Sequence, residues 1–278
     1  MAVDFRAQLV AAQAANASLL CVGLDPEPAK FPGAWAGDAR QIFEFCAAIV
    51  AATKDAVCAY KPQIAYFAAQ RAEDQLERLI AHIHETAPGV PVILDAKRGD
   101  IGATAEQYAR EAFERYRADA VTLSPFMGLD SIEPYMRHTG KGLILLCRTS
   151  NPGGSDLQAQ RLMDGELLYE RIARLAAGEW SAQRGGGQLG LVVGATYPAE
   201  VARVRALAPT LPLLIPGIGA QGGDVQATVQ AGWRADGPIM VSSSRAVLYA
   251  SAGADFADAA RQVALATRAQ LQQARAAR

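Results

Sequence analysis

The sequence predicts a single α/β domain folded as a (β/α)8 barrel, also called a TIM barrel. The chain has 278 residues, against the ~250 that such a barrel typically needs, and 51% of them are hydrophobic. Eight short apolar runs alternate with segments of helical pattern, and the runs lack a clear apolar–polar alternation, as is typical of parallel strands buried on both faces. A doubly wound open sheet remains the structural alternative, because periodicity does not reveal whether a sheet closes.

The elements are expected in regular order along one domain spanning residues 1–278. An amphipathic segment at 1–18 predicts an N-terminal helix before strand one, and it lacks the basic start and apolar run of a signal peptide. Helices are expected between the strands, for example at 38–55 and 256–278. The Gly-rich stretch 184–188 directly precedes strand six as a loop. The eight strands are expected at 18–24, 56–60, 90–96, 120–124, 142–148, 188–195, 212–217 and 238–243.

Composition excludes several classes of protein. A formal charge of −1 gives no sign of a nucleic-acid or membrane partner, and no apolar stretch reaches the roughly 20 residues of a membrane span. We therefore expect a cytoplasmic protein. The cysteines form no CxxC pair or zinc-ligand cluster, so buried reduced thiols are expected at Cys21, Cys46, Cys58 and Cys147.

Charged residues gather at the ends of the first three predicted strands. Strand one ends at Asp25, strand two at Lys61, and strand three runs into Asp95, Lys97 and Asp100. Asp95 and Lys97 are two residues apart, so both point to one face of the strand, which at a barrel strand's end is the interior mouth. A structural salt-bridge network is the alternative. A functional role for these charges is favoured over a purely structural one. Buried ion pairs can often be replaced by apolar residues with no loss of stability, so stability alone does not explain why the charges are there.

The last two predicted strands end in features suited to an anion. Loops after strands seven and eight of such barrels commonly bind phosphate. Arg245 follows strand eight and could clamp a phosphate with two hydrogen bonds. Glycines after strand seven would let backbone N–H groups approach the anion, or would simply make tight turns: Gly217, Gly219, Gly222 and Gly223.

Seven segments together resemble orotidine 5'-phosphate decarboxylases in their longer bacterial form. The resemblance runs in the family's order from about Asp25 to Arg245, and its most specific element is the DxKxxD pattern of Asp95, Lys97 and Asp100. The segments are GLDP, KPQ, LDAKRGDIGAT, RTSNPG, VVGAT, PGIGAQGGD and SSSR. The resemblance implies a (β/α)8 barrel that acts without cofactor or metal. It also implies a homodimer with two active sites at the subunit interface.

The resemblance implies catalytic roles for the charged cluster. Asp25 and Lys61 would bind the ribose hydroxyls, with Lys61 also in the charge network. Asp95 would lie beside the substrate carboxylate, and Lys97 would be the central cation and proton donor. Asp100 would reach into the partner subunit's site.

The remaining residues of the resemblance bind substrate. Thr104 would also reach the partner's site, Ser150 would bond the pyrimidine amide, and Gln221 would bridge base and phosphate. Gly222 and Arg245 would hold the phosphate. Ser244 stands directly before Arg245, where shorter family members carry Gly, so phosphate contacts from Ser243 and Ser244 do not follow from the resemblance.

The residue types suit the implied reaction, which makes UMP from orotidine 5'-monophosphate (OMP). Loss of CO2 from C6 leaves an electron pair in the ring plane, outside the π-system, so a fixed ammonium can stabilise it and then donate a proton. Three alternatives remain. An Mg2+-dependent sugar-phosphate decarboxylase or aldolase shares DxKxxD but carries a carboxylate where Lys61 stands. A phosphate-binding isomerase barrel would not need the Lys/Asp alternation, and a silent scaffold barrel would not need polar strand ends.

Overall fold

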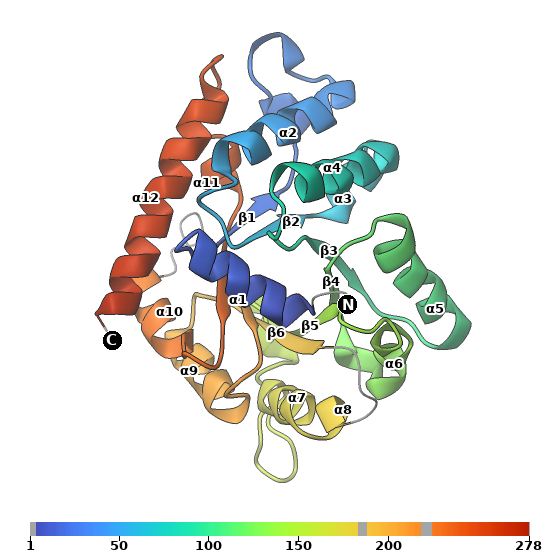
Figure 1. Ribbon diagram of the computed structural model, residues 1–278. Coiled ribbons are helices and arrows are strands. Elements are labelled where there is room, and N and C mark those ends of the chain that lie inside the picture. The colour runs from blue at the N-terminus through green and yellow to red at the C-terminus, as the bar shows by residue number, and fades with distance from the viewer. Residues whose placement is uncertain (1–3, 183–187, 218–223, 278) are drawn as a thin grey trace.

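The computed structural model describes residues 4–182, 188–217 and 224–277, which form a closed (β/α)8 barrel (Figure 1). All strand pairs are parallel, in the order β2-β1-β8-β7-β6-β5-β4-β3. Parallel bridges Tyr60–Val92 and Gln63–Asp95 join the two ends of this order, so the sheet closes and the open-sheet alternative is wrong. Each strand overlaps a predicted one: β1 Leu20–Leu24, β2 Ala59–Pro62, β3 Ile93–Arg98, β4 Ala120–Leu123, β5 Gly142–Arg148, β6 Gln188–Val193, β7 Leu213–Pro216 and β8 Ile239–Ser243.

Helices surround the strands, as Figure 1 shows. In α4, the residues Leu76, Leu79, Ile80 and Ile83 are buried, which is the spacing of one apolar helix face. A π-helical turn, η4 (Glu111–Arg115), directly follows α5. The helices are α1 Phe5–Ala15, α2 Ile42–Thr53, α3 Ile64–Ala68, α4 Glu73–Thr86, α5 Gly102–Arg110, α6 Glu133–Met136, α7 Leu168–Ala177, α8 Glu179–Ala182, α9 Pro198–Leu207, α10 Val225–Gly232, α11 Arg245–Leu248 and α12 Phe256–Ala276.

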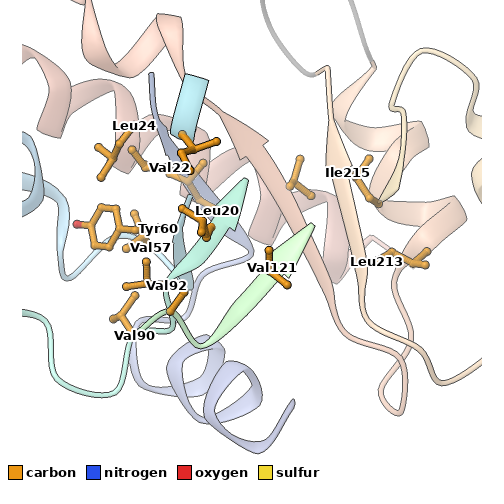
Figure 2. Packing of buried hydrophobic residues seen from close by; sticks show 14 of the residues in the cluster. Leu20, Val22, Leu24, Val57, Tyr60, Val90, Val92, Val121, Leu213 and Ile215 are labelled. Atoms are coloured by element: carbon orange, nitrogen blue, oxygen red, sulfur yellow. The ribbon is translucent and has the colours of Figure 1, made fainter. Parts of the chain in front are cut away.

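The strands are buried on both faces. In β1, Leu20, Val22 and Leu24 belong to the large core cluster between strands and helices, whereas Cys21 belongs to a smaller cluster inside the barrel. Figure 2 shows part of the outer cluster, with β1 side chains near Tyr60. This two-sided burial explains why the apolar runs of the sequence do not alternate with polar residues.

Helix α1 closes the amino-terminal end of the barrel. Asp4 caps it by accepting a hydrogen bond from the Ala7 N–H at 2.8 Å, and Figure 1 shows the helix lying across the strands. Phe5 and Leu9 pack into the inner cluster. A Cβ added at Gly142, the first residue of β5, would lie 2.5 Å from Phe5 Cδ1, so glycine is needed for α1 to seat.

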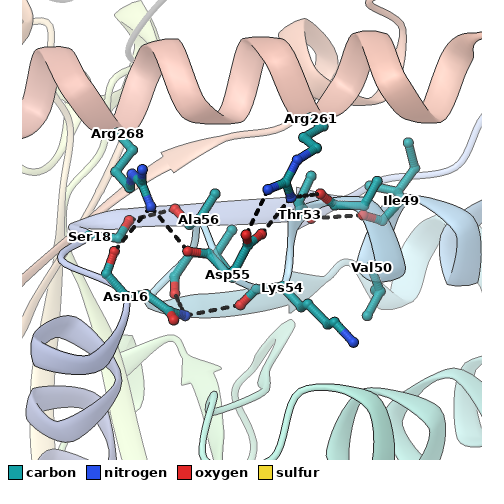
Figure 3. A network of polar contacts seen from close by, with 12 residues as sticks. Asn16, Ser18, Ile49, Val50, Thr53, Lys54, Asp55, Ala56, Arg261 and Arg268 are labelled. Atoms are coloured by element: carbon teal, nitrogen blue, oxygen red, sulfur yellow. Dashed lines mark hydrogen bonds and ion pairs between the residues drawn. The ribbon is translucent and has the colours of Figure 1, made fainter.

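A polar network ties α12 to the beginning of the chain (Figure 3). Arg261 of α12 forms a two-pronged ion pair with Asp55, at 2.6 and 2.7 Å, just after α2. Arg268 donates hydrogen bonds to the carbonyls of Asn16 and Asp55. The side-chain amide of Asn16 donates to the carbonyls of Lys54 and Val57. First and last elements of the barrel are thereby joined.

The cysteines are free and buried, as the sequence predicts. Burial raises the pKa of the Cys21 thiol to about 12, so this thiol stays protonated and unreactive at neutral pH. Within the described ranges, no helix has both the length and the apolar character needed to cross a membrane.

Candidate active site

A cavity of about 580 Å³ opens at the carboxyl ends of the strands. Six predicted site residues line it together, and they come from the ends of β1, β2, β3, β5 and β8: Asp25, Lys61, Asp95, Lys97, Ser150 and Arg245. The volume lies within the range of about 300–1,000 Å³ found for small-molecule sites. Sequence segments far apart in the chain therefore converge on one ligand-sized site, as the strand-end rule for such barrels predicts.

A chain of charges crosses the cavity wall. Lys61 Nζ lies 2.8 Å from Asp95 Oδ2, and Lys97 Nζ lies 2.6 Å from the other oxygen, Asp95 Oδ1. Lys61 and Asp95 are only 6% and 7% exposed, whereas the Lys97 side chain is 47% exposed. The buried pair thus holds a second ammonium that remains open to the cavity.

Both members of the buried pair stay ionised at neutral pH. Burial alone would raise the pKa of Asp95, but attraction and hydrogen bonds from Lys61 and Lys97 lower it well below its usual range. Burial alone would likewise lower the pKa of Lys61, yet attraction to Asp95 and Asp25 raises it. The Lys61–Asp95 pair is therefore permanently charged at physiological pH.

Asp25 offers an acceptor to a ligand. Its Oδ1 atom is buried, lies 3.9 Å from Lys61 Nζ, and has no hydrogen-bond partner in the part of the chain that the structure describes. Tyr249 fixes the loop, since its hydroxyl donates to the Asp25 carbonyl at 2.9 Å and accepts from the Glu27 N–H at 2.7 Å. A buried acceptor on a fixed loop is suited to a hydroxyl of a bound molecule.

The opposite wall combines an apolar surface with a polar loop. Leu146, Val192 and Leu214 line the cavity from β5, β6 and β7. Ser150 lies on the loop after β5, packed so closely on Gly194 that a Cβ there would lie 2.8 Å from the Ser150 backbone. The apolar wall keeps the local dielectric low, which strengthens interactions with the charged cluster.

The buried Arg148 anchors the loop that carries Ser150. Its Nε donates to Glu200 Oε2 at 2.7 Å, and its Nη2 donates to Ser155 Oγ at 3.0 Å. The Gln158 side chain accepts from the Thr149 N–H at 2.8 Å. Glu200 of α9 lies 52 positions from Arg148, whereas Ser155 and Gln158 belong to the loop itself, so the loop is held both from within and by α9.

The far end of the cavity carries the predicted phosphate residues. Arg245 begins α11, is exposed, and forms no ion pair with a carboxylate among the described residues. Gly217 has φ +104°, a conformation that favours glycine. Ser243 and Ser244 also line the cavity, and Gly23 makes room for Ser244, whose Oγ would lie 1.8 Å from an added Cβ. Gln221, Gly219, Gly222 and Gly223 lie outside the described residues.

Two predicted residues do not line the cavity of their own chain. The Asp100 side chain accepts a hydrogen bond from the Ile101 N–H at 2.9 Å, and Thr104 is exposed on α5. Their predicted place is the partner subunit's site, which stays a prediction.

Thr122 is one of the cavity residues that were not predicted from the sequence. Thr122 of β4 lines the cavity at 1% exposure, and its hydroxyl donates to Asp95 Oδ1 at 2.9 Å. The only available signal was a polar residue within the apolar run AVTL, which is weak because threonine is common in strands.

The described residues contain no group of three or more His, Cys, Asp or Glu side chains arranged to hold a metal ion. The cavity carboxylate of Asp95 is instead engaged by two ammonium groups. This donor set favours recognition of an anionic, hydroxylated ligand.

Comparisons with known proteins agree with this geometry. Residues 18–263 match the model of the "Orotidine 5'-phosphate decarboxylase / HUMPS family". Proteins named orotidine 5'-phosphate decarboxylase from Methylibium petroleiphilum and Leptothrix cholodnii are each 72% identical, over 98% and 99% of this chain and 100% and 99% of theirs. The structure of Leishmania donovani OMP decarboxylase is 40% identical, with a TM-score of 0.82 over 97% of this chain and 99% of that one. This chain belongs to the orotidine 5'-phosphate decarboxylase / HUMPS family.

Proposed function

We propose that the protein decarboxylates OMP to UMP and CO2 in de novo pyrimidine biosynthesis, as a cytoplasmic enzyme without cofactor. The observation that carries this proposal is the Lys97 ammonium, which is open to a ligand-sized cavity and held 2.6 Å from the ionised Asp95. The relatives named orotidine 5'-phosphate decarboxylase align with this chain over nearly their full length, which supports the same activity.

The cavity offers a partner for each part of the nucleotide. Arg245 binds the phosphate through a two-pronged, charge-assisted contact. Asp25 Oδ1, which has no hydrogen-bond partner among the described residues, accepts a hydrogen bond from a ribose hydroxyl, and the Lys61 ammonium donates one to a ribose hydroxyl. Ser150 bonds the pyrimidine amide, so that C6 and its carboxylate face Lys97 and Asp95. Gln221 and Gly222 complete the phosphate end in this proposal.

Lys97 carries the chemistry. The bond from C6 to the carboxylate breaks, CO2 leaves, and the electron pair stays on C6. The Lys97 ammonium stabilises this carbanion and then transfers its proton to C6, which gives UMP. The resulting amine takes a proton from solvent. Because Asp95 already holds the ammonium in place, little reorganisation is needed during the reaction.

Asp95 also acts on the ground state. Its lowered pKa keeps a negative charge beside the place of the substrate carboxylate. Loss of CO2 removes one of these two negative charges, and phosphate binding at Arg245 offsets the repulsion in the bound substrate.

We further propose a homodimer in which Asp100 and Thr104 complete the partner's site. Exposed apolar side chains support an interface on this side of the barrel: Ile101 follows β3, and Phe126 (78% exposed) and Met127 follow β4. Large apolar side chains exposed after the neighbouring strands β3 and β4 are suited to an interface between subunits.

The test of the activity is the loss of OMP absorbance in EDTA with no added cofactor. The proposal expects full turnover after exhaustive chelation, since Lys61 and Lys97 would repel a divalent cation. Activity that vanishes in EDTA and returns with Mg2+ would move the assignment to the metal-dependent sugar-phosphate enzymes.

The shared site is tested by mixing two inactive homodimers, Lys97→Ala and Asp100→Ala. Subunit exchange produces heterodimers with one doubly altered site and one native site. Activity should return to about a quarter of the wild-type value for equal random mixing, by the logic of a two-fold interface. If exchange is verified and activity stays absent, Asp100 acts within its own chain.

A further inference from the structure

Lys97 has an unusual backbone conformation for a residue in a strand. Its φ is +47°, in the left-handed region that side chains other than glycine rarely adopt. The register between β3 and β4 also shifts between Leu94 and Arg98. Such a conformation persists only where surrounding contacts hold it. The contacts that hold Lys97 therefore determine where its ammonium lies.

The Thr122 hydroxyl makes three of these contacts. Its Oγ1 accepts hydrogen bonds from two consecutive backbone N–H groups, those of Ala96 and Lys97, each at 3.0 Å. The same hydroxyl donates to Asp95 Oδ1 at 2.9 Å. A hydroxyl has one donor and two acceptor positions, so Thr122 uses all of them at this point.

We propose that Thr122 is a positioning residue that holds the Lys97 backbone in its left-handed conformation and so aims the Lys97 ammonium at the reacting carbon. The proposal rests on the decarboxylase function proposed above. Thr122 itself does not exchange a proton with the substrate; it acts through Asp95 and Lys97.

The surroundings of Thr122 separate this role from ordinary packing. Valine has nearly the shape of threonine, and Ala120, two residues earlier on the same face of β4, belongs to the apolar inner cluster, so valine would fill the same position in the barrel. Valine would leave the Ala96 and Lys97 N–H groups without their acceptor and Asp95 with one donor fewer. Both N–H groups are partly buried, and leaving them unpaired costs free energy, so the segment would turn to find other partners and carry Lys97 with it.

The test compares Thr122→Val with Thr122→Ser, which keeps the hydroxyl. Wild-type decarboxylation is established first, so that a failure of the proposed function is seen independently. Thr122→Val should lower kcat by roughly 10²-fold, the effect expected for misplacing a catalytic group by about 1 Å. UMP affinity should change little, because the phosphate and ribose contacts remain. Thr122→Ser should restore kcat to within about threefold of wild type, since the three hydrogen bonds can form again.

A matched control is Thr53→Val in α2. Thr53 is equally buried, and its hydroxyl contacts the Ile49 carbonyl at 2.8 Å and the Tyr60 hydroxyl at 2.8 Å, away from the cavity. This variant should lose stability without losing kcat. If Thr122→Val does not fold, Thr122→Ala takes its place.

Either of two kinetic results with an active wild type would overturn the proposal. One is a folded Thr122→Val, or Thr122→Ala, with kcat close to that of wild type. The other is an equal loss in Thr122→Ser, which would assign the effect to side-chain size. A crystal structure of the hydroxyl-free variant should show Lys97 with a negative φ, and an unchanged positive φ would also contradict the positioning role.

Discussion

Replacing Asp95 with Asn removes the one negative charge that lies between two ammonium groups, at 2.8 and 2.6 Å, while keeping the side-chain shape. Lys61 would then be a 6% exposed cation whose nearest carboxylate, Asp25, is 3.9 Å away. Removing one partner of a buried pair typically costs roughly 3–5 kcal/mol. The half-exposed Lys97 adds little, because solvent screens its pairing. We expect Asp95→Asn to lower the free energy of unfolding by about 3 kcal/mol.

Urea denaturation of wild type and Asp95→Asn, followed by fluorescence, measures this difference at pH 7. The pKa of Asp95 is lowered in the folded protein, so its contribution is fully present above the usual carboxyl pKa of about 4. It is lost as pH falls from there toward the lowered pKa. The difference in the free energy of unfolding between wild type and Asp95→Asn should therefore become smaller in acid.

A matched control is Asp236→Asn, which breaks the exposed pair with Arg234 and should leave stability unchanged. If Asp95→Asn were as stable as wild type at pH 7, the buried charge pair would not stabilise the fold and the reasoning would be wrong.

Three further changes test other parts of the molecule. Arg245→Ala should raise the KM for OMP strongly but barely affect turnover of the phosphate-free nucleoside orotidine; equal losses would place Arg245 elsewhere. Gly142→Val should destabilise the protein by roughly 1–3 kcal/mol through contact with Phe5, yet leave kcat unchanged, because it lies at the closed end of the barrel; a large fall in kcat would contradict this. The guanidinium of the buried Arg205 donates to six backbone carbonyls. Arg205→Met should therefore cost roughly 3 kcal/mol or more in urea unfolding, and a cost below about 1 kcal/mol would refute that role.

The fold was predictable because each strand is a buried apolar run. The carboxyl-terminal bounds of two strands differ from the prediction where the strands carry site residues. Strand β2 continues through Lys61 and Pro62, and β3 through Lys97 and Arg98, although the apolar runs predicted at 56–60 and 90–96 end earlier. In a sequence, polar residues at the end of a strand cannot be told from the polar residues of the loop that follows. Barrel closure depends on the pairing of β1 with β8, which lie at opposite ends of the chain, and on the bridges between β2 and β3; periodicity encodes neither.

The charged part of the site was predictable because charges directly after buried runs must lie at the barrel mouth. Thr122 and Arg205 were not, since their roles depend on partners that only the fold brings near. Thr122 acts on the backbone of a residue 25 positions earlier. Arg205, on a helix, bonds carbonyls up to 33 positions later. A threonine in a strand or an arginine in a helix carries no local sign of such contacts.

In the proposed reaction, Lys97 stabilises the carbanion at C6 and then protonates it. The most direct measurement is OMP turnover by Lys97→Ala, with UMP binding followed by calorimetry on the same sample. We expect a folded protein that still binds UMP and has lost essentially all decarboxylation, because the missing ammonium acts mainly in the transition state. Turnover within about tenfold of wild type by that folded variant, a loss of only ~1.4 kcal/mol in transition-state stabilisation, would contradict it.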